Sequence, residues 1–269
     1  MGLSTGGVAG THVDRDVSLR LGVCATSSPE VIVAPSFQTA WLQAVGFLAE
    51  RGWAAPNLIV QISDPCALDD AIHQQVCSFA AARGLLGPKH VAYTIFPHRL
   101  YEKRGSAEEV FRSYNRPAGM YERLRRRAPG WWGTYFRRMT HYETAERPQN
   151  QLQNIISAVL SRKRIYRAAY TIALQKVGPE TIRPLGGPCL DFLAVQLEGG
   201  TTHRLGLMGV YRNQDFLERA YGNYWGLCNL LTFLAAETHY APGALTCVSS
   251  RAYVSGDKRP LKELLGSLG

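Results

Sequence analysis

The sequence lacks any apolar run that approaches the roughly 18 residues needed to span a bilayer. Its longest candidate, 224–236, is interrupted by Gly226, Asn229 and Thr232. The first residues also lack the order of positive charge and then apolar side chains that marks a secretory signal. Position 6 is glycine, so the myristoylation pattern is not met either. We therefore expect no membrane partner.

Metal-binding and disulfide patterns are missing as well. No Cys-x-x-Cys pair occurs, and no cluster of histidine and cysteine has zinc spacing, so we expect no metal. An even number of cysteines could form disulfides, but the chain is long for a disulfide scaffold and shows no signal peptide. Reduced thiols and a cytoplasmic location are therefore expected. The six cysteines are Cys24, Cys66, Cys77, Cys189, Cys228 and Cys247.

Acidic residues are few relative to basic ones. Against 30 lysines and arginines stand 21 aspartates and glutamates, which gives a net charge of +9. This sign favours an anionic partner, and phosphorylated small molecules, nucleic acid and membrane surfaces all satisfy it. With 46% hydrophobic residues, the 269-residue chain can bury a sizeable core. No internal repeat or low-complexity linker is present, so we expect a flexible tail over 1–16 and a single domain over 17–269.

The hydrophobic pattern alternates between strand and helix in the first hundred residues. It predicts strands over 17–24, 30–34, 57–62 and 90–96, and helices over 37–51, with Ser36 as N-cap, and 67–82. Further along, it predicts helices over 150–161 and 224–238, the second closed by Pro242-Gly243, and strands over 168–174, 190–197, 205–211 and 244–254. The helix over 224–238 is almost entirely apolar, so it should be buried. The expected fold class is α+β.

The segment 101–140 is basic and aromatic, and the stretch YERLRRRAPGWWGTYFRRMTHY begins within it. Arg123–Arg127 can be read as a solvated helix face. Alternatively, 123–138 forms a nucleic-acid-binding patch, because arginines and stacked aromatic rings bind single strands. The cluster is short and no RNA-binding signature accompanies it, so nucleic acid is the less favoured partner.

One cysteine stands out in GGPCLDFL, residues 186–193. Taken alone, Cys189 is most simply a small buried residue. A reactive thiol would need positive charge nearby. Downstream, Arg212 and Asp215 end a predicted strand just before a loop, a position suited to binding. Asn223, at the start of the apolar helix, is most simply an N-cap.

Together these residues resemble the thymidylate synthase family, including its pyrimidine-nucleotide hydroxymethylases. The family places its nucleophile in a Pro-Cys pair, matched by Pro188-Cys189. It then has Arg-Ser-x-Asp after a strand, matched by the Arg-Asn-Gln-Asp of 212–215, and an asparagine eight residues after the Asp, matched by Asn223. A long apolar helix follows in both.

Upstream landmarks occur in the same order. The family's Gly-x-Tyr-Gly-x-Arg resembles 133–138, its Asp-Gln-Leu resembles Asn150-Gln151-Leu152, and its Arg-Arg pair resembles Tyr166-Arg167. The resemblance covers roughly 130–255. It implies a thymidylate-synthase-like fold, with a large mixed sheet packed against a long buried helix and dimerising through the sheet.

The resemblance also implies an activity, namely transfer of a one-carbon unit to C5 of a pyrimidine nucleoside monophosphate. Cys189 would attack C6, Tyr135 would take part in a proton relay, and Asn223 would hydrogen-bond the ring. Asp215 would either hold the loop and Arg212 or contact the ligand. The implied carbon donor is 5,10-methylenetetrahydrofolate.

Phosphate and sugar contacts follow from the same resemblance. Arg212 and Asn213 would bind the nucleotide phosphate, and Arg167 would complete that site from the partner subunit of a homodimer with shared active sites. Tyr253 and Arg251 fall near the family's His-x-Tyr sugar contact. Uracil or cytosine, ribose or deoxyribose, and a methyl or a hydroxymethyl product all remain open.

Departures from the family pattern support an alternative. The Glu-Leu-x-Trp motif that carries the family's catalytic glutamate is missing, and Leu190 and Ala194 stand where the family has polar residues. A catalytically divergent nucleotide-binding homologue is therefore the second reading, and a nucleic-acid-binding protein is the third.

Overall fold

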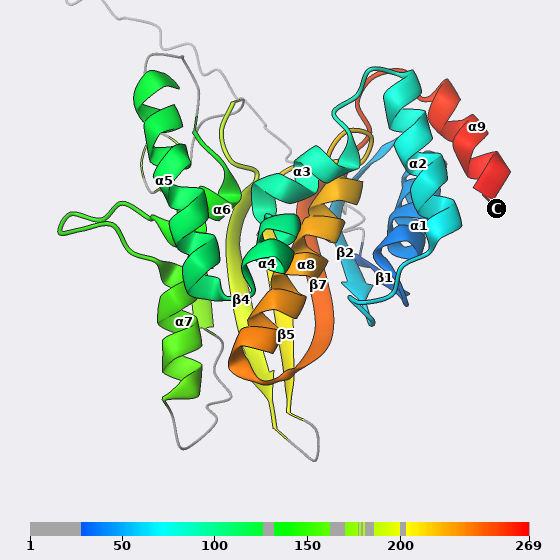
Figure 1. Cartoon of the computed structure of the whole chain (residues 1–269). Coiled ribbons are helices and arrows are strands. Elements are labelled where there is room, and N and C mark those ends of the chain that lie inside the picture. The colour runs from blue at the N-terminus through cyan, green and yellow to red at the C-terminus, as the bar shows by residue number, and fades with distance from the viewer. Residues whose placement is uncertain are drawn as a thin grey trace, which may run out of the picture.

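The structure is a computed structural model and describes residues 28–125, 132–161, 170–176, 178, 180, 186–199 and 203–268 (Figure 1). The predicted tail 1–16, the predicted strand 17–24 and Arg167 lie outside the described residues. The side chains of Arg123–Arg127 all lie outside the described part of the chain as well. No helix in the described ranges is long and apolar enough to cross a membrane.

A seven-stranded sheet organises the part of the chain that the structure describes. Its order is β1-β2-β7-β5-β4-β3, and the short β6 pairs with β7. The pairs β1–β2, β5–β7 and β6–β7 are parallel, whereas β2–β7, β4–β5 and β3–β4 are antiparallel. The strands are Glu30–Ala34 (β1), Ala54–Ile62 (β2), Tyr170–Ala173 (β3), Leu190–Glu198 (β4), Arg204–Tyr211 (β5), Gln214–Asp215 (β6) and Ala241–Tyr253 (β7). The prediction of an α+β fold is thereby confirmed.

Helices α1 (Phe37–Glu50) and α8 (Ala220–Thr238) cover one face of this sheet (Figure 1). The register sets Val60, Cys247, Gly209 and Leu193 side by side across four strands, and a Cβ on Gly209 would meet Leu227 of α8. Fourteen of the nineteen residues of α8 are buried, as its apolar sequence predicts. This face forms the core.

The opposite face of the sheet carries a second apolar row. Val31, Ile59, Val248, Val210 and Phe192 are register partners across five strands. They are half-buried or exposed, up to 56% for Val31. We call this row the open sheet face.

The remaining helices lie toward the two ends of the sheet (Figure 1). Near β1 and β2 lie α2 (Asp70–Ala82) and α9 (Arg259–Leu268); near β4 lie α5 (Ala107–Arg125), α6 (Tyr135–Thr140) and α7 (Gln151–Leu160). Two further helices, α3 (Pro88–Ile95) and α4 (His98–Arg104), pass in front of the sheet beside α8. As predicted, Ser36 caps α1, and its side chain accepts a hydrogen bond from the Thr39 N–H.

Two predictions about secondary structure are wrong. The predicted strand 90–96 is mostly helix α3, because Pro88 occupies the first turn of the helix and Val91, Ala92 and Ile95 recur at helical spacing on its buried side. The predicted stop at Pro242-Gly243 lies inside β7. Helix α8 ends earlier, where His239 adopts a left-handed conformation and its N–H bonds the carbonyls of Ala235 and Ala236.

Candidate functional site

A cavity of about 330 Å³ opens at the end of the sheet where Cys189 precedes β4. The sequence singled out six of the residues that line it. They come from five separate segments of the chain and are Tyr135, Cys189, Asn213, Asp215, Asn223 and Tyr253. The volume is at the lower end of the range for small-molecule pockets, so it suits one ligand of modest size.

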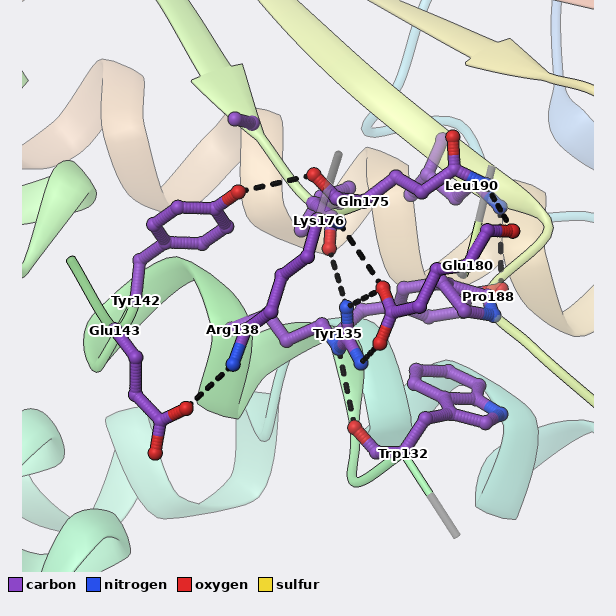
Figure 2. Close-up of polar contacts among 12 residues, drawn as sticks. Trp132, Tyr135, Arg138, Tyr142, Glu143, Gln175, Lys176, Glu180, Pro188 and Leu190 are labelled. Carbon is purple, nitrogen blue, oxygen red and sulfur yellow. Dashed lines mark hydrogen bonds and ion pairs between the residues drawn. The ribbon is translucent and has the colours of Figure 1, made fainter. Parts of the chain in front are cut away.

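Tyr135 and Cys189 form the floor of this cavity. Thr134 caps α6 and thereby places Tyr135 as the first residue of the helix. The Tyr135 hydroxyl accepts hydrogen bonds from the backbone N–H groups of Cys189, at 3.1 Å, and Leu190, at 3.2 Å. Burial raises the pKa of Tyr135 to about 12, so its hydroxyl keeps its proton at neutral pH. The neutral phenol therefore lies directly beside the cysteine backbone, and Figure 2 shows Tyr135 next to Pro188 and Leu190.

Opposing effects act on the Cys189 thiol. Burial raises its pKa, the neighbouring Arg212 charge lowers it, and Asp191 raises it; a hydrogen bond from Arg212 and the charge of Arg219 lower it further. Burial dominates, so the pKa lies above that of a free thiol. Arg212 thus favours the thiolate, but its charge does not offset the effect of burial on the thiol pKa.

Arg212 is anchored to the cysteine segment. Its Nε donates to the Pro188 carbonyl at 3.1 Å, and its backbone N–H donates to the Cys189 carbonyl at 3.0 Å. Arg212 is not among the described residues that line the cavity, although it lies immediately behind the thiol. Arg251 also stays outside the lining; it is exposed, with its guanidinium 5.6 Å from the centre of the Tyr253 ring.

Asp215 both holds the loop and reaches the cavity. Its Oδ1 accepts hydrogen bonds from the N–H groups of Leu217, at 3.0 Å, and Ser255, at 3.3 Å. Because β6 pairs with the end of β7, these bonds keep Asn213 and Tyr253 together at the cavity, where their side chains share a hydrogen bond.

Asn223 lies in the first turn of α8, not at its cap, so its interpretation as an N-cap is wrong. Arg219 occupies the cap position, and no side chain caps the helix. Asn223 is buried and lines the cavity, which leaves its amide available to a ligand rather than to the helix end.

Sequence reasoning missed several groups at the site. Glu218 and Arg219 line the cavity with their charged atoms 4.0 Å apart. Asp191 sits where β4 bulges, half-buried beside Cys189, and burial raises its pKa to about 6. One sequence signal could have identified Asp191 as a site residue, namely the alternation of charged and apolar residues just after Pro188-Cys189. For Glu218 and Arg219, the sign was their position at the start of the long helix.

The basic segment does not form a continuous exposed patch where the structure describes it. Arg137 and Arg138 are only 8% and 7% exposed. Arg137 donates to Asn115 at 2.7 Å, and Arg138 pairs with Glu180. The two arginines therefore cannot contribute to a nucleic-acid surface without leaving the core.

No family model matches the sequence, and neither does any curated protein.

Other reactive groups are sparse. Within the described ranges, no three of His, Cys, Asp and Glu come together as a metal site. The five cysteines that the structure describes are free thiols, and of these only Cys189 lines the cavity. The arrangement can therefore offer one thiol, two phenols, three side-chain amides, the Asp215 carboxylate and the Glu218–Arg219 pair to a single ligand.

Proposed function

We propose that the protein is a thymidylate-synthase-like transferase that adds a one-carbon unit to C5 of a pyrimidine nucleoside monophosphate through a covalent Cys189–C6 adduct. One observation carries this proposal: six residues matched to that family on sequence grounds line one cavity around Cys189. Their convergence supports a thymidylate-synthase-like fold as well, because the family's motifs are far apart in the chain.

Cys189 supplies covalent catalysis in this proposal. Its thiolate forms a bond to C6, and the π electrons of the C5–C6 double bond move toward C5 and the ring's polar edge, which makes C5 nucleophilic. C5 then forms a bond to the one-carbon unit as the bond from that unit to its carrier breaks. Loss of the C5 proton and expulsion of the Cys189 thiolate restore the C5–C6 double bond. Addition of water to the transferred carbon gives a hydroxymethyl product, whereas hydride from the reduced carrier gives a methyl product. The thiol must first lose its proton, and Arg212 and Arg219 stabilise the thiolate that results.

Asn223 and Tyr135 act on the pyrimidine ring of the proposed substrate. The Asn223 amide can donate to or accept from the ring edge as negative charge develops there, so it is compatible with uracil and with cytosine. The Tyr135 hydroxyl, which keeps its proton, would pass protons through bound water near C5. Arg212, Asn213 and Arg167 of a partner subunit would hold the phosphate, and Tyr253 and Arg251 would contact the sugar.

The implied carbon donor, 5,10-methylenetetrahydrofolate, supplies the one-carbon unit when it is bound. The residues present suit a ring that carries N–H donors, because the Glu218 carboxylate lines the cavity and can accept from them. A volume of about 330 Å³ is too small for nucleotide and folate together, so the folate would extend over the rim.

The open sheet face supports a homodimer. It is an apolar surface across five strands, and such surfaces on soluble proteins mark interaction sites. The resemblance implies that such a dimer shares its active sites, with Arg167 of the partner subunit as the second phosphate contact.

The test is incubation of the full chain with UMP, dUMP, CMP or dCMP and methylenetetrahydrofolate, followed by mass measurement of the nucleotide. We expect a gain of a methyl or hydroxymethyl group with at least one of the four, and its loss in Cys189→Ala. Cys66→Ala is the matched control, because Cys66 is exposed and does not line the cavity. If none of the four nucleotides changes mass at high protein concentration, one-carbon transfer is ruled out.

The raised pKa of Cys189 favours a second candidate, a nucleotide-binding homologue without turnover. Such a protein keeps its nucleotide affinity in Cys189→Ala and forms no adduct in the wild type. Calorimetry with the two proteins separates the candidates.

A further inference from the structure

Arg138 is a buried cation whose hydrogen bonds tie three segments of the chain together. Its Nε donates to the Trp132 carbonyl at 3.1 Å, and one terminal nitrogen donates to the Leu174 carbonyl at 2.8 Å. The two terminal nitrogens also each donate to a carboxylate oxygen of Glu180 at 2.8 Å. Figure 2 shows this fork from the end of α6 to the segment that precedes Cys189. A planar guanidinium suits such a paired contact, and lysine does not.

Glu180 is also held by hydrogen bonds within its own segment of the chain. It accepts the Lys176 backbone N–H at 3.0 Å, and its carbonyl accepts from the Gln175 side chain at 3.2 Å. The hydrogen bond from Arg138 is the main reason that the pKa of Glu180 lies below its usual range. The carboxylate therefore stays ionised, and the pair persists across the neutral range.

The Arg138–Glu180 ion pair fixes the position of the Trp132 residue at the cavity. The Arg138 guanidinium lies 5.4 Å from the centre of the Trp132 ring, in addition to its bond to the Trp132 carbonyl. The Trp132 and Tyr135 rings lie 4.7 Å apart, and both line the cavity. Arg138 thus supports Trp132, Trp132 contacts Tyr135, and Tyr135 holds the Cys189 and Leu190 N–H groups.

We infer that Arg138 and Glu180 are positioning residues of the cavity, whose ion pair fixes Trp132 as the wall against which a planar ring of the ligand lies. The identity of that ring as a pyrimidine rests on the proposed function. The pair itself does not line the cavity, so its effect on ligand binding must pass through Trp132 and Tyr135.

Ligand binding provides the first test, with full-length protein and calorimetric titration of UMP, dUMP, CMP and dCMP. We expect Glu180→Gln and Arg138→Lys each to raise the Kd of the best-bound nucleotide about tenfold, which equals about 1.4 kcal/mol. Arg137→Lys is the matched control, because Arg137 is the adjacent, equally buried arginine of α6, does not line the cavity, and donates to Asn115. Its Kd should stay within about twofold of the wild type. Ribose 5-phosphate, which has no planar ring, should show no dependence on Glu180.

Coupling to Trp132 separates positioning from a general structural role. In a Trp132→Ala background, Glu180→Gln should change the nucleotide Kd by less than about twofold, because the wall is already lost. A further tenfold loss in that background would show that the pair does not act through Trp132 and would overturn the inference. Glu180→Gln is the milder variant and keeps this cycle measurable if Arg138→Lys does not fold.

Hydrogen exchange gives a readout that needs no ligand. The Cys189 and Leu190 amides should exchange faster in Glu180→Gln than in the wild type, and should be unchanged in Arg137→Lys. If the wild type binds none of the four nucleotides, the proposed function fails while this measurement still decides the inference. Equal exchange in the wild type and Glu180→Gln would refute it.

Discussion

The Tyr135 hydroxyl accepts hydrogen bonds from two consecutive N–H groups, those of Cys189 and Leu190. One phenol from α6 therefore fixes the backbone on which the candidate nucleophile sits, 54 residues further along the chain. The ladder of β4 begins only at Leu190, so at Cys189 the phenol acts together with one backbone bond, from the Arg212 N–H to the Cys189 carbonyl.

Tyr135→Phe should therefore lower stability and disturb Cys189 together. Two buried N–H groups lose their acceptor, so the free energy of unfolding should fall by about 1–3 kcal/mol in urea titrations. The rate at which iodoacetamide alkylates Cys189, followed by mass spectrometry, should change as well. Tyr101→Phe is the control, since the Tyr101 hydroxyl donates to Glu237 at 2.8 Å and Tyr101 is not part of the cavity lining. Equal alkylation rates in the wild type and Tyr135→Phe would show that the phenol does not position the cysteine.

Asp191 should make the reactivity of Cys189 depend on pH. Above the Asp191 pKa of about 6, its negative charge opposes the thiolate. Asp191→Asn removes that charge, so alkylation of Cys189 at pH 7.5 should be about threefold faster, which corresponds to half a pKa unit. The difference should disappear near pH 5, where the wild-type carboxyl is protonated. Asp70→Asn, an exposed acid on α2, should leave the rates unchanged.

The raised pKa of Asp191 also predicts how the stability of the fold depends on pH. The folded-state pKa of Asp191 lies above its ordinary value of 3.8, so the folded chain binds this proton more tightly than the unfolded chain. Its stabilising contribution is complete below about pH 4 and is lost as pH rises through about 6. The urea midpoint of the wild type should therefore fall more between pH 4 and pH 6 than that of Asp191→Asn. Parallel midpoints for the two proteins would contradict this assignment.

Much of the fold could be predicted because local patterns agree with it. The apolar run of α8, the N-cap Ser36, the amphipathic helix near 150–161, and the strand patterns around 30–34 and 205–211 each have one local solution. For 90–96 the local pattern was ambiguous, since β-branched and aromatic residues favour strand while Pro88 and the spacing of Val91 and Ile95 favour helix. Packing against Gly222 and Gly226 of α8 decides in favour of the helix.

At the candidate site, motif spacing identified residues that meet in space but not their electrostatic environment. Cys189 and Asn223 were selected through the resemblance to the thymidylate synthase motifs, because each taken alone had a simpler structural interpretation. That Arg212 bonds Pro188 rather than lining the cavity depends on tertiary contacts between distant segments. The raised pKa of Asp191 could not be predicted from the sequence either, because it comes from burial, which no local sequence pattern reports.

The open sheet face should hold two copies of the chain together. Val248 lies at its centre, between Ile59 and Val210 in the register, and is half-buried. Val248→Lys should convert a dimer to a monomer in sedimentation experiments at micromolar concentration, because an apolar contact is replaced by a charge. Its flexible stem lets the lysine reach water in the monomer, so the fold should persist. Gln74→Lys, on the exposed side of α2, should remain dimeric. A wild-type protein that sediments as a monomer would remove the shared-site proposal.

Because α3 packs closely on α8, a change at their contact should alter both the stability of the fold and ligand binding in the cavity. A Cβ at Gly226 would lie 2.8 Å from the Ala92 carbonyl oxygen and 2.9 Å from the Ile95 Cβ, and neither can move without shifting α3. Gly226→Ala should therefore lower the free energy of unfolding by about 1–3 kcal/mol. It should also weaken nucleotide binding, because Val91 and Thr94 of α3 line the cavity. Gly46→Ala is the matched control in α1: nothing lies within 4 Å of its Cβ, so it should stabilise the protein by about 0.5–1 kcal/mol and leave binding unchanged. A Gly226→Ala protein with wild-type stability would mean that the two helices are not packed as closely as the structure has them.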